Sequence, residues 1–358
     1  QSNKRDEKTF ENREGSNLTE NLQKITWAFI INQYECNNSP DHVAELIKFS
    51  ACVKEISTDS RLKDYLKEYM KINGFENIKQ LIRHGYLLFA LPEEIYNTAD
   101  FYSRFPIIPA KQQASCLQNI SINSEYYQSE PQKNIYYKFL NERPLFELRE
   151  NEYAILDVAF LKGKIYTGFI FDFYYQTSLK NDSYYPKFDK FKSEFLSKKV
   201  IEEVVFKRTF EKIFVQRNNV VYFDNKEKIS VPDCFCRTND TIYFFECKDY
   251  LLNSNIYQTY SYEEIKKTID LKFIKDESGI AQIKKQINNY INCTNEFPCD
   301  KNFSRTSRNL ILYPIIVHTN FTLSLPGIQQ YLNEQLKIEL ATISIPSNII
   351  IKDLTLVN

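Results

Sequence analysis

Three residues suited to metal-dependent phosphate chemistry lie close together in the segment 231–249. Asp233 follows a proline, and Glu246 and Lys248 stand two positions apart further along the segment. Carboxylate oxygens are ligands that Mg²⁺ prefers, and the bound ion usually keeps several waters and phosphate oxygens. A neighbouring lysine can orient an attacking water and stabilise negative charge on a phosphate. We therefore interpret Asp233 and Glu246 as metal ligands and Lys248 as a catalytic residue.

A β-hairpin is predicted to bring these residues together. Residues 229–237 and 241–248 are rich in β-branched and aromatic side chains, and turn-forming residues separate them. Because side chains alternate along a strand, Glu246 and Lys248 share one face of the hairpin. A register symmetrical about the turn would place Asp233 beside Glu246, although the sequence alone leaves the register open. The same alternation puts three thiols on the back of the hairpin, namely Cys234, Cys236 and Cys247.

A helix is predicted after the hairpin, over residues 279–291. Isoleucines recur at helical spacing along one stripe, while Gln282, Gln286 and Tyr290 stand at intervals of four on the neighbouring stripe. One face of this helix would pack, and the other would offer two amides and a phenol. An ordinary amphipathic helix with polar ends is the alternative.

These motifs resemble those of a known nuclease superfamily. Pro232-Asp233 followed by Glu246-Cys247-Lys248 is similar to the signature of the PD-(D/E)xK nucleases, and Gln286-x-x-x-Tyr290 resembles a motif of their exonuclease branch. The resemblance covers about residues 190–358. It implies a restriction-endonuclease-like α/β core with a mixed sheet, and a nuclease that depends on Mg²⁺ or Mn²⁺.

The resemblance also implies further site residues. A glutamate on the helix before the hairpin often joins the metal site of this superfamily, and a helix is predicted over residues 191–214. Glu203 is our choice because it borders the packed stripe that contains Phe206 and Phe210, with Glu202 as the alternative. The backbone carbonyl of Cys247 is a further expected ligand. The expected substrate contacts are Gln282, Gln286, Tyr290 and Lys285.

The remaining pattern divides the chain into four parts. Residues 1–16 predict a disordered start, residues 17–100 a helical domain, residues 101–184 a mixed, β-containing connecting region, and residues 185–358 the nuclease-like domain. Within the nuclease-like domain, strands are expected at 309–318 and 348–357 and a helix at 326–340. Upstream, helices are expected at 18–34, 40–56, 60–72 and 76–90, and strands at 153–161 and 164–175, although a buried helix fits 164–175 equally well.

The composition is compatible with a nuclease but does not indicate one. Lys plus Arg equals Asp plus Glu at 46 each, so nucleic acid would need a local basic surface. The absence of a long apolar span or signal peptide predicts a cytoplasmic protein without membrane contact. We expect a DNA endonuclease of a restriction or anti-phage defence system, with DNA favoured over RNA. The helical domain would bind a protein partner or mediate self-association. A non-catalytic nucleic-acid-binding or assembly subunit with the same fold is the alternative.

Overall fold

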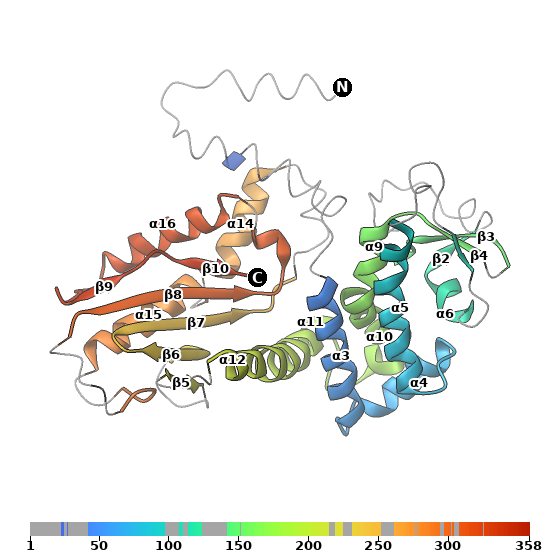
Figure 1. Ribbon diagram of the computed structural model, residues 1–358, viewed down its shortest axis with the longest axis horizontal. Helices are drawn as coiled ribbons and strands as arrows, with labels where there is room; N and C mark the ends of the chain where they lie inside the picture. The colour runs from blue at the N-terminus through green and yellow to red at the C-terminus, as the bar shows by residue number, and fades with distance from the viewer. Residues whose placement is uncertain are drawn as a thin grey trace, which may run out of the picture.

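The fold places N-terminal helices before mixed sheets with interspersed helices (Figure 1). The computed structural model describes residues 23–24, 27, 42–96, 107–109, 114–123, 142–150, 152–214, 219–224, 231–251, 261–275, 278–293, 297–301, 303, 308–324 and 326–358. The expected disordered start and most of the expected helix at 18–34 lie outside these residues. Among the described helices, none combines the length and the apolar content that a membrane crossing requires.

The first half forms a helical lobe with a small sheet beside it. Three helices open the lobe: α3 (His42–Thr58), α4 (Lys63–Ile72) and α5 (Ile78–Tyr96). The small sheet has the order β1-β4-β3-β2 and consists of β1 (Ile107–Pro109), β2 (Ser121–Ile122), β3 (Leu145–Arg149) and β4 (Glu152–Ile155), with α6 (Ala114–Asn119) before β2. The expected helices at 40–56, 60–72 and 76–90 are confirmed.

The segment after β4 is helical, so of the two alternatives for residues 164–175 the buried helix is the one formed. The segment contains α9 (Val158–Gly163), η1 (Lys164–Gly168), α10 (Phe169–Gln176) and the short η2 (Ser178–Asn181). The expected strand at 153–161 ends at Ile155, because the Asp157 side chain accepts a hydrogen bond from the Phe160 amide and caps α9. A continuous apolar run has no periodicity that separates a buried strand from a buried helix, and here the helix is formed.

The second half is built on a six-stranded mixed sheet. Its path is β10-β8-β7-β6-β5, with β9 also paired to β8. The strands are β5 (Asn219–Phe223), β6 (Cys234–Thr238), β7 (Thr241–Lys248), β8 (Leu310–His318), β9 (Ile349–Ile351) and β10 (Thr355–Val357). Strands β5, β6 and β7 pair antiparallel, whereas β8 pairs parallel with β7, β9 and β10. The expected final strand at 348–357 is thus two short strands, and β5 was not predicted.

Helices cover both faces of this sheet. On one face, α14 (Tyr262–Phe273), α15 (Ile280–Asn292) and α16 (Ile328–Leu340) form an apolar core with the strands. The other face meets a long continuous helix made of α11 (Phe188–Phe191), η3 (Lys192–Phe206) and α12 (Lys207–Phe214), in which η3 is wound as a π-helix. The Phe210 ring of α12, for example, lies 4.7 Å from the Phe245 ring of β7.

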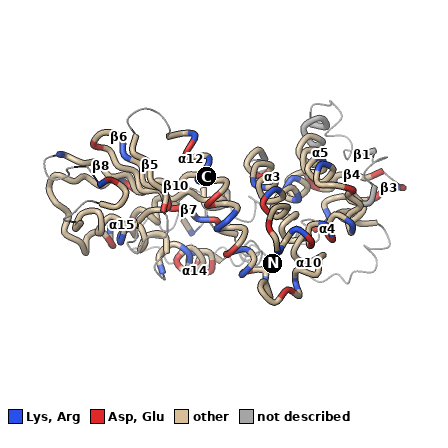
Figure 2. The backbone as a smooth tube through the Cα atoms, turned by 90° about the horizontal axis from the view of Figure 1, so that it is seen from below, with Lys and Arg blue, Asp and Glu red and all other residues tan. Residues whose placement is uncertain are grey.

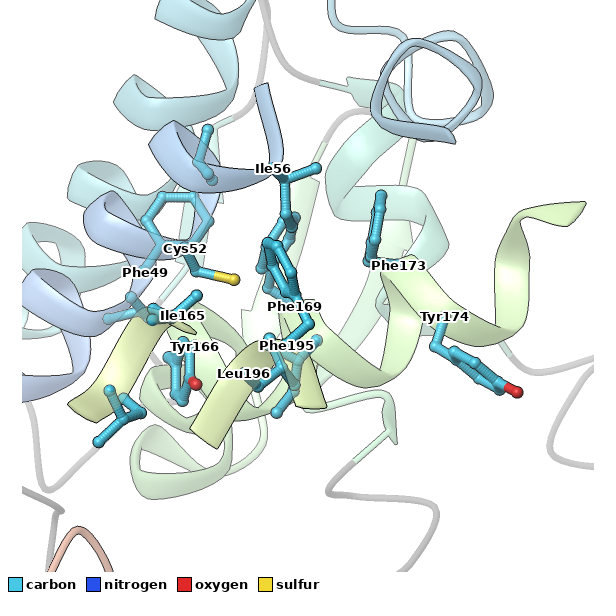
Figure 3. Packing of buried hydrophobic residues seen from close by; sticks show 14 of the residues in the cluster. Phe49, Cys52, Ile56, Ile165, Tyr166, Phe169, Phe173, Tyr174, Phe195 and Leu196 are labelled. Atoms are coloured by element: carbon cyan, nitrogen blue, oxygen red, sulfur yellow. The ribbon is translucent and has the colours of Figure 1, made fainter. Parts of the chain in front are cut away.

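The core under this long helix joins the two lobes. Phe49, Cys52 and Ile56 of α3 pack towards Phe169 of α10 and Phe195 of η3 (Figure 3). The same apolar cluster continues to the back of the hairpin, where it includes Cys234, Cys236 and Cys247. The expected position of the three thiols is therefore confirmed. They pack as small hydrophobic side chains and help to seat the helical lobe on the sheet.

We predict that Trp27 anchors its part of the chain to the second half of the molecule, which contains the six-stranded sheet. Its side chain is fully buried beside Tyr262 and Tyr331, and its indole N–H donates to the Pro326 carbonyl at 3.1 Å. Trp27→Ala should lower the free energy of unfolding by about 3–5 kcal/mol in urea denaturation followed by circular dichroism. Tyr86→Ala on α5, where the side chain is 51% exposed, is the control and should cost no more than about 0.5 kcal/mol. Equal stability of the two variants would contradict the anchoring role.

Candidate functional site

The hairpin register brings the two predicted carboxylates together. Thr238 pairs with Thr241 and Cys234 pairs with Phe245, so the same register carried one position further sets Asp233 opposite Glu246. The two carboxyl groups lie close enough to share a hydrogen bond. The register that the sequence left open is therefore symmetrical about the turn, and Asp233 and Glu246 occupy one site.

Lys248 and two glutamines surround this carboxyl pair. The Lys248 ammonium donates to Glu246 Oε1 at 2.8 Å and to Gln282 Oε1 at 3.0 Å. The other oxygen of Glu246 accepts a hydrogen bond from Gln286 Nε2 at 2.8 Å. Glu246 is 1% exposed, so both of its oxygens are fixed in a water-poor environment. Asp233 is fixed separately, because its Oδ2 accepts from the Cys247 amide at 2.7 Å.

The electrostatics of the pair favour binding of a cation. Burial and then the negative charge of Glu246 raise the pKa of Asp233 well above its ordinary value. Burial alone would lower the pKa of Lys248, but the charges of Glu246 and Asp233 outweigh it and raise that pKa. Lys248 is therefore a protonated ammonium at neutral pH. A hard divalent cation would relieve the repulsion between the two carboxylates, and their oxygens are the donors that Mg²⁺ prefers.

The upstream glutamate that approaches this site is Glu202, the alternative, and not Glu203. Burial, and then the charge of Asp233, raise the pKa of Glu202 to about 7, whereas Glu203 is exposed to solvent. The choice of Glu203 assumed ordinary helical spacing. In the π-helix η3 the hydrogen bonds join residues five apart, and this winding turns the glutamate preceding Glu203 towards the hairpin.

The same winding aligns a buried polar network that the sequence reading missed. Lys192, Ser197 and Glu202 are spaced five apart along η3. The Lys192 ammonium contacts Asp249 Oδ2 at 3.1 Å and the Asp249 carbonyl at 2.7 Å, and Ser197 Oγ donates to Oδ2 at 2.7 Å. The other carboxylate oxygen accepts from Thr319 Oγ1 at 2.6 Å. Burial alone would raise the pKa of Asp249, but Lys192 and the two hydroxyls lower it, so this carboxylate remains charged.

This network clamps the long helix to the carboxyl ends of β7 and β8, directly beside Lys248. The sequence contained a partial signal, because Asp249 follows Lys248 immediately. Its partners lie 57 residues upstream and 70 residues downstream, however, and no local spacing connects them.

Helix α15 directs its two glutamines towards the carboxyl pair and Lys248, and does not form the expected stripe of substrate contacts. Gln286 is fully buried and holds Glu246, while Gln282 is partly buried and binds Lys248. Tyr290 is also fully buried, against Phe235, Phe244 and Phe297, so the expectation that it contacts substrate is wrong. Lys285 is exposed on the same helix.

Two further features concern the polar groups that a metal ion could meet in this site. Gln286 Oε1 is a buried oxygen that has no hydrogen-bond partner among the described residues, on the amide that binds Glu246. Within the described residues no group of three or more His, Cys, Asp or Glu side chains is placed to hold a metal ion. The carboxylate ligands available to one ion are thus Asp233 and Glu246, with Glu202 outside that pair. Two carboxylates fit Mg²⁺, because this ion usually completes its coordination with water.

Comparisons of the chain with protein-family models, with curated proteins and with solved structures gave no match. The geometry of the site therefore has to carry the functional argument.

We predict that Glu202 destabilises the metal-free protein as the pH rises. Its pKa is about 7 in the folded chain against an ordinary value of 4.5, so the folded state binds more protons between these values and loses stability as the pH increases through them. Glu202→Gln removes this penalty. In the presence of a chelator at pH 8, this substitution should raise the free energy of unfolding by roughly 1–2 kcal/mol, allowing for partial solvent screening. At pH 4.5 the substitution should have little effect on stability.

Glu203→Gln is the matched control, because the neighbouring side chain is exposed on the same helix. Thermal denaturation of both variants at the two pH values is the measurement. A gain for Glu202→Gln that does not depend on pH would show that the pKa of Glu202 is not raised in the folded chain.

Proposed function

We propose that this protein is a metal-dependent nuclease that hydrolyses phosphodiester bonds. The observation that carries the proposal is the hairpin register that sets Asp233 opposite Glu246, with the Lys248 ammonium 2.8 Å from Glu246 Oε1. Two hard oxygen donors beside a fixed ammonium form a site for a divalent cation and a phosphate group. Their order along a hairpin, Asp and then Glu-x-Lys, is that of the PD-(D/E)xK nucleases.

In this proposal Asp233 and Glu246 hold Mg²⁺ or Mn²⁺, together with the backbone carbonyl of Cys247. When bound, the ion would polarise the phosphate and lower the pKa of a coordinated water. Neighbouring groups of the chain orient both carboxylates. The Cys247 amide orients Asp233, and Gln286 together with Lys248 orients Glu246.

Lys248 would act as a charged donor in the reaction. Its raised pKa keeps the ammonium protonated at neutral pH, so it is suited to orienting the attacking water and to stabilising negative charge on the phosphate. Gln282 holds the ammonium from the opposite side. Glu202, near the pair and partly protonated at neutral pH, would act as a proton acceptor at the edge of the site or would help to bind a second ion.

DNA is the substrate we favour, and endonucleolytic cleavage in a restriction or anti-phage defence system is the activity we favour. Lys and Arg are interspersed with Asp and Glu over both lobes, so the charge distribution marks no lobe as wholly basic (Figure 2). A nuclease needs only local cations, because its bound metal offsets part of the phosphate charge. The helical lobe would bind a protein partner or a second copy of the chain. The second candidate, a non-catalytic binding subunit, is disfavoured by the joint presence of Asp233, Glu246 and Lys248.

The proposal is tested by incubating the protein with single- and double-stranded DNA and RNA in Mg²⁺, in Mn²⁺ or in a chelator. We expect cleavage that requires the ion. Asp233→Asn, Glu246→Gln and Lys248→Ala should each lower the rate by about 10²-fold or more, since each removes a metal ligand or the charged donor.

Glu203→Gln is the control and should cleave like the parent protein. Binding of Mn²⁺ measured by calorimetry separates the roles, because Asp233→Asn and Glu246→Gln should weaken it while Lys248→Ala should not. Cleavage that persists in Asp233→Asn and Lys248→Ala would exclude the assigned site. If the parent protein cleaves none of the substrates, the non-catalytic candidate is favoured.

A further inference from the structure

An exposed cluster of aromatic rings lies on the helical lobe, where α10 meets α11. Its members are Phe171 and Tyr175 of α10 and Phe188 of α11, which we call the aromatic platform. The Phe171 and Phe188 rings stack with centroids 4.4 Å apart, and the Tyr175 ring lies 6.4 Å from Phe171 and 6.0 Å from Phe188. The planes of each pair differ by 17°, 5° and 19°, so the three rings are nearly parallel.

The platform is open to solvent. Tyr175 is 53% exposed and Phe171 is 36% exposed, whereas the next aromatic residues of α10, Phe173 and Tyr174, are buried in the core. Phe188 is partly buried and packs against the core, so it supports the two more exposed rings of Phe171 and Tyr175. Contiguous exposed apolar surface of this kind marks a binding site more often than it contributes to stability.

One cation contacts the platform directly, because the Lys180 ammonium donates to the Tyr175 carbonyl at 3.1 Å. Arg61 and Lys190 flank Tyr184, a ring outside the platform, at 4.1 Å and 4.4 Å from its centre, and Lys190 also pairs with Glu194 at 3.9 Å. The nearby carboxylate of Asp182 is engaged within the chain, since it accepts from the Tyr65 hydroxyl and from the amides of Tyr184 and Tyr185. Asp189 is an exposed carboxylate in the same segment. The surface thus combines parallel rings with positioned cations, which suits a ligand that has both flat rings and negative charge.

The platform lies on the long helix that also borders the candidate active site. Helix α11 runs into η3 without a break, and Lys192 follows Phe188 by four residues, a rise of roughly 6 Å. Lys192 contacts Asp249, which is the neighbour of Lys248. One continuous helix therefore carries both a ring of the platform and a residue of the network beside the site.

We propose that the aromatic platform binds unpaired bases of the nucleic acid that the site acts on, with Tyr175 and Phe171 as stacking surfaces. This inference rests on the proposed function and adds a substrate feature to it, namely a single-stranded stretch next to the cleaved bond. Bases within a duplex are already stacked on both faces, whereas unpaired bases can stack on protein rings. Lys180 would attract the accompanying phosphates.

The test measures binding of a fluorescent oligothymidylate and of a duplex by anisotropy, with the full chain in a chelator so that no cleavage occurs. Tyr175→Ala and Phe171→Ala should each weaken binding of the single strand about tenfold and change duplex binding much less. Tyr86→Ala is the matched control, an aromatic residue of similar exposure on α5, and it should bind like the parent protein.

Three results would overturn the inference: no binding of the single strand by the parent protein, unchanged binding by both platform variants, or an equal loss for duplex and single strand. Sedimentation velocity gives a fourth, since loss of a dimer without loss of oligonucleotide binding would assign the platform to contacts between copies. The binding assay does not need catalysis, so the two proposals can fail separately. If the parent protein cleaves no substrate but the platform variants bind the single strand more weakly, the platform is supported and only the nuclease proposal is rejected. Cleavage together with unchanged binding by both variants would reject only the platform.

Discussion

The repulsion between two carboxyl groups in a shared, water-poor position is the constraint on which the rest of the site depends. Asp233 and Glu246 contact each other, and bringing two such groups together is costly unless hydrogen bonds and a positive charge compensate. Lys248, Gln286 and the Cys247 amide supply that compensation in the chain itself. Each of these groups comes from an element that is buried on at least one side, so the surrounding core holds the pair in a defined arrangement. Such an arrangement is typical of a site that binds a cation.

The helical lobe takes part in this arrangement and does not merely precede it. One apolar cluster runs from α3 through α10 and η3 to the thiols behind the hairpin. At its edge, Lys192 and Ser197 of η3 bind Asp249, and Thr319 after β8 completes the clamp. A change of position of the long helix would therefore move Asp249 and, with it, the neighbouring Lys248.

The winding of the long helix decides which of its side chains can participate. In an ordinary helix Glu203 would border the packed stripe, but the π-helical hydrogen bonds of η3 place Lys192, Ser197 and Glu202 along the hairpin. The helix thereby supplies a cation, a hydroxyl and an acid to one side of the site. Gln282 and Gln286 of α15 approach from the other side of the sheet end. The site is thus formed between two helices at the carboxyl end of β7.

The sequence by itself determined the hairpin and the common face of Glu246 and Lys248, because strand alternation and turn residues are local properties. It also determined the helix that carries Gln282 and Gln286, through the spacing of its isoleucines. The register that sets Asp233 opposite Glu246 was decided by the structure. Only the tertiary structure decided that Tyr290 belongs to the core, that residues 164–175 form a helix, that Glu202 faces the site and that Lys192 and Thr319 meet at Asp249. These outcomes depend on packing between segments far apart in the chain and on a helical winding that residue spacing does not reveal.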